Sequence, residues 1–226
     1  MAYIRVISGA GRYVDDRHDF ARTSGQISSI VERAGHRARV LPDDPGSFRN
    51  LGDTDLMVLN IGGEPGKPLT PSPDWARTHR DFGDWISAGG RVLALHTAML
   101  AFSDWELWTW LVGGQWASGR SQFVPGAFGE LWPCDSARHH PVWEGLDQVS
   151  SFEERLLSVQ LDPASKPIMG YGREGATEIM GWTKGDNMLY DGAGHDHRSY
   201  ESPSRARLLV NEVNWLVGRS PSGLIA

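Results

Sequence analysis

Short apolar runs alternate with amphipathic stretches through the first hundred residues of the chain. The apolar runs predict strands over 3–8, 36–41, 55–61 and 91–96. Apolar residues at three-and-four spacing predict helices over 22–34 and 74–88, and each helix is followed by glycine. Strands that alternate with helices are typical of a parallel sheet. The pattern therefore predicts an α/β fold, a mostly parallel sheet with helices on both faces.

The remaining chain is less regular until its last third. The segment DWELWTWLVGG predicts a short helix, and FGELWPCD and VSSFEERLLSV predict edge or excursion strands. Segments 177–183 and 188–195, joined by a KGDN turn, predict a β-hairpin. A last helix is expected to start with Ser202 as its N-cap and to end near Gly218. Because no linker divides the chain, we expect a single domain over 1–226.

Composition excludes several classes of protein. The net charge is −6 and no long basic run is present, so neither nucleic acid nor an anionic membrane is an expected partner. No apolar run approaches the ~20 residues of a membrane-spanning helix, and the amino terminus does not resemble a secretory signal. The lone Cys134 excludes an intramolecular disulfide and fits a reducing compartment. We therefore expect a cytoplasmic protein.

Several histidines and an amide fall where parallel strands are predicted to end. His96 ends the strand over 91–96, and Asn60 lies at the end of the strand before it. His18 lies in the loop after the first strand, and His195 ends the hairpin. Ligands of open α/β sheets bind at the carboxyl ends of the strands. These positions therefore predict the functional site, whereas His36 and His79 are interpreted as surface residues.

Three imidazoles with a carboxylate would suit Zn²⁺ or a similar divalent ion. They would equally suit a metal-free acid–base cluster, because histidine titrates near neutral pH. The carboxylate could come from Glu153 or Glu154, and the period of a strand turns only one of the two toward the site. No nucleotide cofactor is expected, because Val14 replaces the third glycine of a dinucleotide-binding motif.

The remaining sequence features concern covalent nucleophiles and aromatic residues. No G-x-S-x-G elbow is present, and Cys134 does not lie in a strand–elbow–helix context, so a nucleophilic serine or cysteine is not predicted. The chain has ten tryptophans. Flat aromatic faces pack against the C–H faces of sugars, although large aromatics also fill cores.

These motifs, taken in order, resemble the ThuA-like (trehalose utilisation) family of the class I glutamine amidotransferase-like superfamily. The resemblance rests on His18–Asp19, DLMVLN, GGRVLALH, LVGGQW, HHPVWEGL, FEERL and GAGHD. It implies a flavodoxin-like sheet. It also implies that Glu154 matches a family carboxylate, and it favours Asp19, Asn60, Trp116 and His140 as substrate-binding residues.

Two departures limit what the resemblance implies. Amidotransferases carry a nucleophilic cysteine at the elbow that His96 occupies here, so a cysteine-dependent glutaminase is not expected. The family often has a further histidine after LVGGQW, where this chain has Ala117-Ser118-Gly119-Arg120. That replacement removes one candidate site residue.

The resemblance associates the chain with disaccharide catabolism through 3-keto sugars. We therefore expect a metal-assisted enzyme acting on 3-keto-glycosides or related carbohydrates by proton abstraction next to the ketone, with elimination and hydration or hydrolysis. His96, Glu154 and His18 are the expected catalytic residues, and His18, His96, His195 and Glu154 the expected ligands of the metal. The alternatives are a non-catalytic carbohydrate- or metabolite-binding protein and a hydrolase or isomerase of another small molecule. The sequence leaves open whether the protein forms a homo-oligomer.

Overall fold

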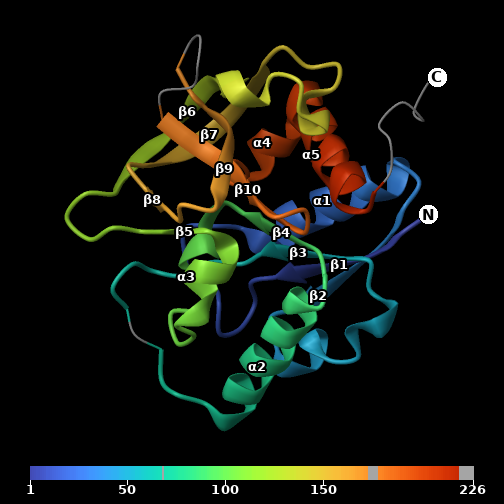
Figure 1. Ribbon diagram of the computed structural model, residues 1–226, viewed down its shortest axis with the longest axis vertical. Helices are drawn as coiled ribbons and strands as arrows, with labels where there is room; N and C mark the ends of the chain where they lie inside the picture. The colour runs from blue at the N-terminus through green and yellow to red at the C-terminus, as the bar shows by residue number, and fades with distance from the viewer. Residues whose placement is uncertain (68, 173–177, 219–226) are drawn as a thin grey trace.

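The computed structural model describes residues 1–67, 69–172 and 178–218. A nine-stranded sheet organises them in the order β2-β1-β3-β4-β11-β10-β9-β6-β7 (Figure 1). Its strands are β1 (Tyr3–Ser8), β2 (Arg37–Pro42), β3 (Leu56–Asn60), β4 (Val92–Leu95), β6 (Gln122–Pro133), β7 (Val149–Leu157), β9 (Ser165–Tyr171), β10 (Glu178–Lys184) and β11 (Met188–Asp191). The expected α/β fold is confirmed.

The first five strands of that order are mutually parallel. Strands β3 and β4 are buried along their whole length, because helices cover both faces of the sheet. Their carboxyl ends lie on one edge together with those of β1 and β11. The loops that follow these four strands therefore meet at that edge, where sheets of this kind bind ligands.

Helices pack on both faces of the parallel strands, as expected. They are α1 (Phe20–Arg33), α2 (Pro73–Ser87), α3 (Leu107–Val112), α4 (His197–Glu201) and α5 (Pro203–Leu216). Helices α1 and α5 contribute to one hydrophobic core, and α2 and α3 contribute to the core of the opposite face (Figure 1). The side chains of Asp19, Ser72 and Ser202 cap α1, α2 and α5 by accepting from backbone N–H groups, which satisfies donors that a helix start leaves free.

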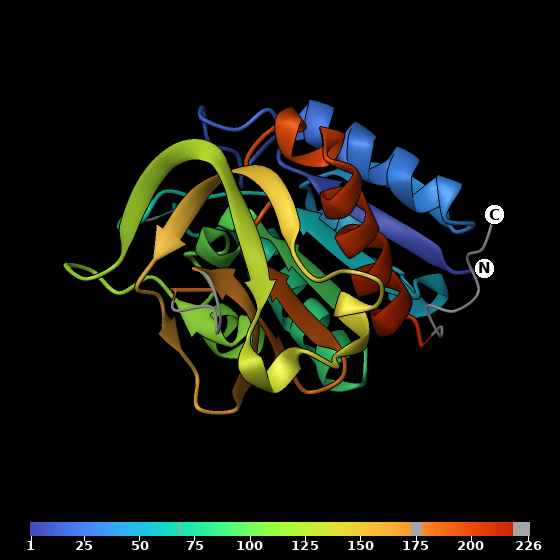
Figure 2. The ribbon, with the colours of Figure 1, turned by 90° about the horizontal axis from the view of Figure 1, so that it is seen from above.

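The last four strands of the order pair antiparallel. The expected hairpin is β10–β11, although Thr177 lies outside the described residues. Strand β6 begins at Gln122, well before the predicted segment, and β9 was not predicted. Figure 2 shows that β6 and β7 arch back over the sheet, which is therefore curled. The curl brings β7 to the carboxyl ends of the parallel strands.

Short elements complete the fold. A two-stranded sheet joins β5 (Gly114–Gln115) to β8 (Gln160–Leu161). The 3-10 helices are η1 (Pro45–Phe48), η2 (Leu51–Asp53), η3 (His96–Leu100), η4 (Asp135–Ala137) and η5 (Pro141–Trp143). Within the described ranges, no helix combines the length and apolar character needed to cross a membrane.

Two histidines lie elsewhere than predicted. The interpretation of His36 and His79 as surface residues is wrong, because they are 5% and 4% exposed. His36 Nε2 lies 3.0 Å from Asn214 Oδ1 on α5, and His79 Nε2 lies 2.8 Å from the Tyr13 hydroxyl. Both imidazoles therefore link a peripheral segment to the core. Cys134 is buried, and burial raises the pKa of its thiol to about 11, which fits an inert cysteine.

Candidate metal and active site

Four side chains meet at the carboxyl edge of the sheet. One nitrogen each of His18, His96 and His195 and one oxygen of Glu154 lie within 4.8 Å of one another. We call these four residues the histidine–glutamate cluster. His18 comes from the loop between β1 and α1, His96 follows β4, His195 follows β11, and Glu154 lies on β7. The structure thus brings together four residues that are far apart in the sequence.

The spacing of the facing atoms suits one small cation. Glu154 Oε2 lies 3.5 Å from His96 Nε2 and 3.8 Å from both His18 Nε2 and His195 Nδ1. His18 Nε2 and His195 Nδ1 are 3.1 Å apart. A tetrahedron of ligands bound ~2.0–2.1 Å from Zn²⁺ has edges of roughly 3.3 Å. The observed separations bracket that value.

The outer nitrogens of two imidazoles are already engaged. His18 Nδ1 lies 2.6 Å from Asp15 Oδ1, and His96 Nδ1 lies 2.7 Å from the carbonyl oxygen of Gly192. A carbonyl oxygen only accepts, so His96 Nδ1 must carry the hydrogen, and an ionised Asp15 requires the same of His18. In a neutral imidazole the inner Nε2 then holds a free electron pair. Metal-binding histidines are oriented by outer partners of this kind.

Two inner atoms of the cluster lack a protein donor among the described residues. His96 Nε2 and Glu154 Oε2 are buried, and neither has a hydrogen-bond partner among the described residues. With its outer nitrogen donating to Gly192, a neutral His96 turns an electron pair toward a carboxylate oxygen 3.5 Å away. Two acceptors that face each other in a buried space are unfavourable unless a positive charge lies between them. The donor set therefore fits a divalent cation such as Zn²⁺.

Burial and the neighbouring groups favour neutral His18 and His195 beside an anionic Glu154. Burial lowers the pKa of His18 despite its contact with Asp15. Burial, followed by the nearby His96 and His18, lowers the pKa of His195 to about 4. Burial acts to raise the pKa of Glu154, but His96, His195 and Arg17 together outweigh it and the pKa is lowered. Near neutral pH, His18 and His195 therefore have free electron pairs and Glu154 is ionised.

The backbone turns sharply where β4 ends at the cluster. His96 has a φ of +46°, in the left-handed region, and it begins η3 directly after the strand. This conformation is uncommon for a residue with a side chain. The turn separates His96 from the sheet and directs its imidazole to the edge where Glu154 arrives. The strand ends at His96 because the chain turns there into the site.

The two neighbouring glutamates have different surroundings. Glu153 is fully buried, and its Oε2 accepts from the backbone N–H groups of Gly194 at 2.7 Å and His195 at 3.1 Å. Its Oε1 accepts from the Ser151 hydroxyl at 2.6 Å. Glu153 therefore holds the loop that carries His195, while Glu154 faces the cluster itself. Glu154 Oε1 lies 3.8 Å from the guanidinium of Arg17, which leaves Oε2 for the imidazoles.

The other expected site residues lie around the cluster or away from it. Asp19 caps α1 directly after His18, and the amide of Asn60 donates to the hydroxyls of Thr23 and Ser24 at 2.8 Å each. Asn60 is thus engaged in holding the start of α1.

Trp116 and His140 lie in different regions of the surface. Trp116 stacks on Phe123 and lines a cavity beside η3. His140 caps η5, and its ring packs against Trp215 in the last turn of α5. Of the pair His195 and His197, only His195 enters the cluster; His197 begins α4 and lies 3.9 Å from Glu201.

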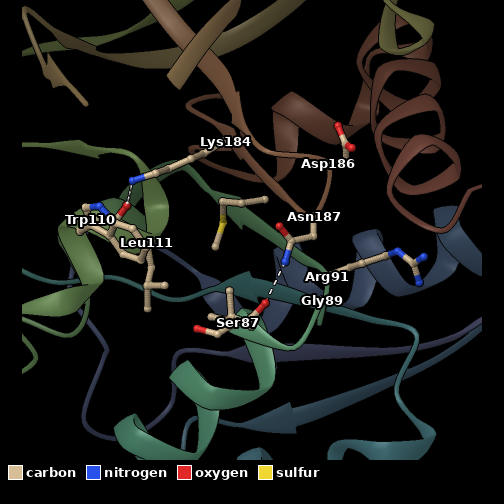
Figure 3. Close-up of a pocket in the computed structure, with 10 residues that line it drawn as sticks. Ser87, Gly89, Arg91, Trp110, Leu111, Lys184, Asp186 and Asn187 are labelled. Atoms are coloured by element: carbon tan, nitrogen blue, oxygen red, sulfur yellow. Dashed lines mark hydrogen bonds between the residues drawn. The ribbon is translucent and has the colours of Figure 1, made fainter. Parts of the chain in front are cut away.

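A separate cavity lies at the opposite, amino ends of the strands. It has a volume of about 510 Å³ and lies where β4 and β11 begin, with Trp110, Leu111 and Met188 in its wall. Figure 3 shows Lys184 reaching toward Trp110 while Arg91 extends away to the other side. Lys184 is already engaged with the Trp110 carbonyl and with Asp162. The described residues of its wall therefore present no converging set of reactive groups.

The sequence did not reveal the supporting residues. Asp15 precedes His18 by three residues in DDRHD, but Asp16 is closer in sequence, two residues before His18, and is exposed. The carbonyl of Gly192 carries no sequence signal. Glu153 and Arg17 could be found only by knowing how the β11 loop and β7 approach each other. Period-two alternation indicated that only one of Glu153 and Glu154 could face the site. The resemblance to the family then favoured Glu154.

Solved structures with the same fold cover nearly the whole chain. A ThuA-like protein from Parabacteroides merdae shares 16% identity at a TM-score of 0.76, over 99% of this chain and 92% of its own. A ThuA-like protein from Bacteroides uniformis shares 14% identity at a TM-score of 0.71, over 98% and 94%. A glutamine amidotransferase from Thermotoga maritima shares 11% identity at a TM-score of 0.61, over 96% and 98%. These similarities show the class I glutamine amidotransferase-like fold.

The sequence itself gives the family. No curated protein matches it. The sequence model of the ThuA family, described as trehalose utilisation, matches residues 6–216. That range contains the strands from β2 to β11 and every member of the histidine–glutamate cluster. The chain therefore belongs to the ThuA (trehalose utilisation) family.

Proposed function

We propose that this protein is a metal-assisted enzyme that acts on 3-keto-glycosides or related sugar derivatives. The observation that carries the proposal is the convergence of three imidazole nitrogens on a carboxylate oxygen, with two of these buried atoms lacking any hydrogen-bond partner among the described residues. A polar group buried without a partner is costly, so such a cluster persists when a ligand satisfies it. The family, with its link to trehalose utilisation, supports a sugar as substrate.

His18, His96 and His195 are the proposed ligands. Their inner nitrogens face one point, and Asp15 and Gly192 fix the orientation of two of the rings. Three protein ligands with one open position are typical of catalytic zinc sites. A bound divalent ion would supply Lewis acidity to a substrate oxygen.

Glu154 is the proposed proton carrier. Its lowered pKa keeps it ionised near neutral pH, and Arg17 binds its other oxygen, so Oε2 can accept a proton from the substrate. In a 3-keto-glycoside the carbon between the ketone and the anomeric carbon is acidic. Glu154 takes that proton, and the electron pair of the C–H bond moves toward the ketone oxygen.

The glycosidic bond breaks when the electron pair moves back from the ketone oxygen. The pair forms a double bond between the deprotonated carbon and the anomeric carbon, and the bond from the anomeric carbon to the leaving oxygen breaks. Protonated Glu154 gives its proton to the leaving group, which departs as an alcohol. Addition of water across the double bond then completes a net hydrolysis, and no oxidant or reductant is consumed.

Metal content and turnover test the proposal together. Untagged wild-type protein is expected to contain about one divalent ion per chain by elemental analysis, and His96→Ala is expected to lose it. Glu154→Gln keeps the shape of the side chain, so it should retain the ion but lose at least about 100-fold in turnover of a 3-keto-glucoside. Loss of the ion from Glu154→Gln would make Glu154 a fourth ligand and would overturn its role as the base.

A carbohydrate-binding protein without catalysis makes the opposite prediction. It would bind a sugar tightly and release no alcohol from the keto-glycoside, and Glu154→Gln would leave its sugar affinity unchanged. Wild-type protein without metal and without turnover would favour that alternative.

A further inference from the structure

A β-bulge interrupts the pairing of β6 and β7 directly opposite Glu154. The paired residues on either side of the irregularity are Val124 with Arg155 and Ala127 with Glu153. Two residues of β6, Pro125 and Gly126, thus lie opposite the single residue Glu154 on β7. An extra residue of this kind bends the strand that carries it and increases the local twist. The strand pair is therefore bent at the proposed proton carrier.

The residues of the bulge suit an irregular and crowded position. Proline lacks the N–H that a regular ladder requires, and within sheets it is confined to edges and bulges. A Cβ atom on Gly126 would lie 2.6 Å from Cε1 of Phe152 and 3.5 Å from Cδ2 of His195. The backbone of the bulge therefore touches the Phe152 ring and passes beside the histidine–glutamate cluster.

Strand β7 changes the face that it buries at the same point. Its buried residues are Val149, Ser151, Glu153, Glu154 and Leu156, whereas a regular strand alternates without a break. Val149 belongs to the core that includes α1 and α5, and Leu156 belongs to the core of the opposite face. Within the arch of Figure 2, β7 thus passes from one core to the other between Glu153 and Glu154.

The two halves of β7 are held in different ways. The first half is bonded to the helices beside it, because the carbonyl oxygens of Ser150 and Phe152 accept from the hydroxyls of Ser202 and Ser199. In the described part of the chain, no side chain bonds the backbone of residues 154–157. The pairing with β6, including the bulge, therefore sets the course of the half that begins with Glu154.

We propose that Pro125 and Gly126 are positioning residues for Glu154. Their bulge bends the strand pair so that the Glu154 carboxylate turns to the histidine–glutamate cluster. The bulge acts on the direction of that side chain and not on the substrate. The role of Glu154 as proton carrier rests on the proposed function, whereas its placement by the bulge does not. Because a misplacement of about 1 Å can lower a rate by about 100-fold, this placement determines turnover.

Two glycine substitutions on the same strand test the proposal. Gly126→Ala places a methyl group against the Phe152 ring and should lower kcat for a 3-keto-glucoside by about 10- to 100-fold, with little change in KM. Gly129→Ala is the matched control, because its Cβ would lie 2.8 Å from Cε1 of Tyr171 but outside the bulge. It should keep a kcat close to that of the wild type, and both variants should retain the ion.

Two double variants show whether the loss passes through Glu154. In the Glu154→Gln background, Gly126→Ala should lower kcat further by no more than about twofold, because both changes then act on one group. Phe152→Leu removes Cε1 and Cζ, the two ring atoms nearest to a methyl group at position 126. Combined with Gly126→Ala, it should therefore restore most of the lost kcat.

Crystal structures of the wild type and Gly126→Ala distinguish this inference from the proposed function. Glu154 Oε2 should move from its position 3.5 Å from His96 Nε2, whether or not the protein cleaves a keto-glycoside. An unmoved Glu154, an equal loss of kcat in Gly129→Ala, a full further loss in the Glu154→Gln background, or no rescue by Phe152→Leu would overturn the positioning role. A displaced Glu154 in a protein whose wild type has no turnover would overturn the proposed function alone.

Discussion

The contact between Asp15 and His18 determines which imidazole nitrogen faces the cluster. Asp15 Oδ1 also accepts from the backbone N–H of Arg17 at 3.0 Å, so the loop holds the carboxylate in place. The imidazole lowers the pKa of Asp15 even though burial acts to raise it. The carboxylate is therefore ionised near neutral pH and strengthens His18 as a ligand.

Removing that charge should weaken metal binding. Asp15→Asn is expected to lower the affinity for Zn²⁺ by about 10- to 100-fold, as is typical for an outer partner of a metal-binding histidine. Competition with a chelating dye measures this affinity. Asp16→Asn is the control, because Asp16 is exposed and adjacent in sequence. Equal affinities of the two variants would show that Asp15 does not act through His18.

Glu212, in contrast to Asp15, keeps its proton because it is buried. It is fully buried, with Oε2 3.8 Å from Arg205 Nη1, while Arg205 Nη2 pairs with Asp191 at 2.5 Å. Burial, followed by the charge of Asp191, raises the pKa of Glu212 well above its usual range. One arginine thus neutralises one carboxylate, and Glu212 retains its proton.

This proton makes stability fall as the pH rises. Above the usual glutamate value of about 4.3, the unfolded chain releases the proton that the folded chain keeps. The stabilising contribution is therefore complete below that value and is lost as the pH approaches the raised pKa. Glu212→Gln should flatten the decline and raise the free energy of unfolding at neutral pH, measured by urea titration across the pH range. Glu32→Gln, on the exposed side of α1, should change neither.

At the scale of elements, the turn from β4 into η3 concentrates backbone strain at His96. A left-handed conformation costs a residue with a Cβ about 1–2 kcal/mol. Glycine avoids that cost but loses about 0.4–1 kcal/mol through the greater freedom of the unfolded chain. His96→Gly should therefore be more stable than His96→Ala by about 0.5–1 kcal/mol in denaturant unfolding with chelator present. If His96→Ala were the more stable variant, the turn would not be strained.

The hydrophobic pattern of the sequence predicted the buried parallel strands and the amphipathic helices well. β1 has the predicted bounds, and β3, β4 and α2 lie within one residue of theirs, because buried parallel strands and amphipathic helices have distinct periods. The sequence SKPIMGY of β9 has a proline, a glycine and a short apolar run, so nothing local marks it as a strand. Segment 165–171 is a strand because it pairs with β10 and β6.

The same limit applies to the site. Parallel strands end at one edge, so His18, His96 and His195 could be grouped from sequence. His79 could have been placed in the core, because it falls on the helix stripe of Trp75, Phe82 and Ile86. His36 could not, since its partner Asn214 is 178 residues away.

At the scale of the molecule, the proposed ion would link the loops that follow β1, β4 and β11. A ligand at 100 times its dissociation constant adds about 2.7 kcal/mol to the free energy of unfolding. For a chain of this size that corresponds to about 5–10 °C in Tm. Chelation should therefore lower the Tm of the wild type by this amount and leave that of His96→Ala unchanged. Equal shifts in both proteins would place the effect of the chelator elsewhere.

The curl of the sheet has a consequence for the order of folding. Glu154 lies on β7, the last strand of one edge, whereas His18 follows β1 near the other edge. Their approach requires the antiparallel strands to form and to arch back, and contacts between segments distant in sequence form slowly. Refolding in the presence of a metal-sensitive dye should show the tryptophan signal changing before the metal is captured. Capture of the ion would then mark chains in which β11 lies beside β4, and turnover would begin only after β7 has brought Glu154 to the cluster.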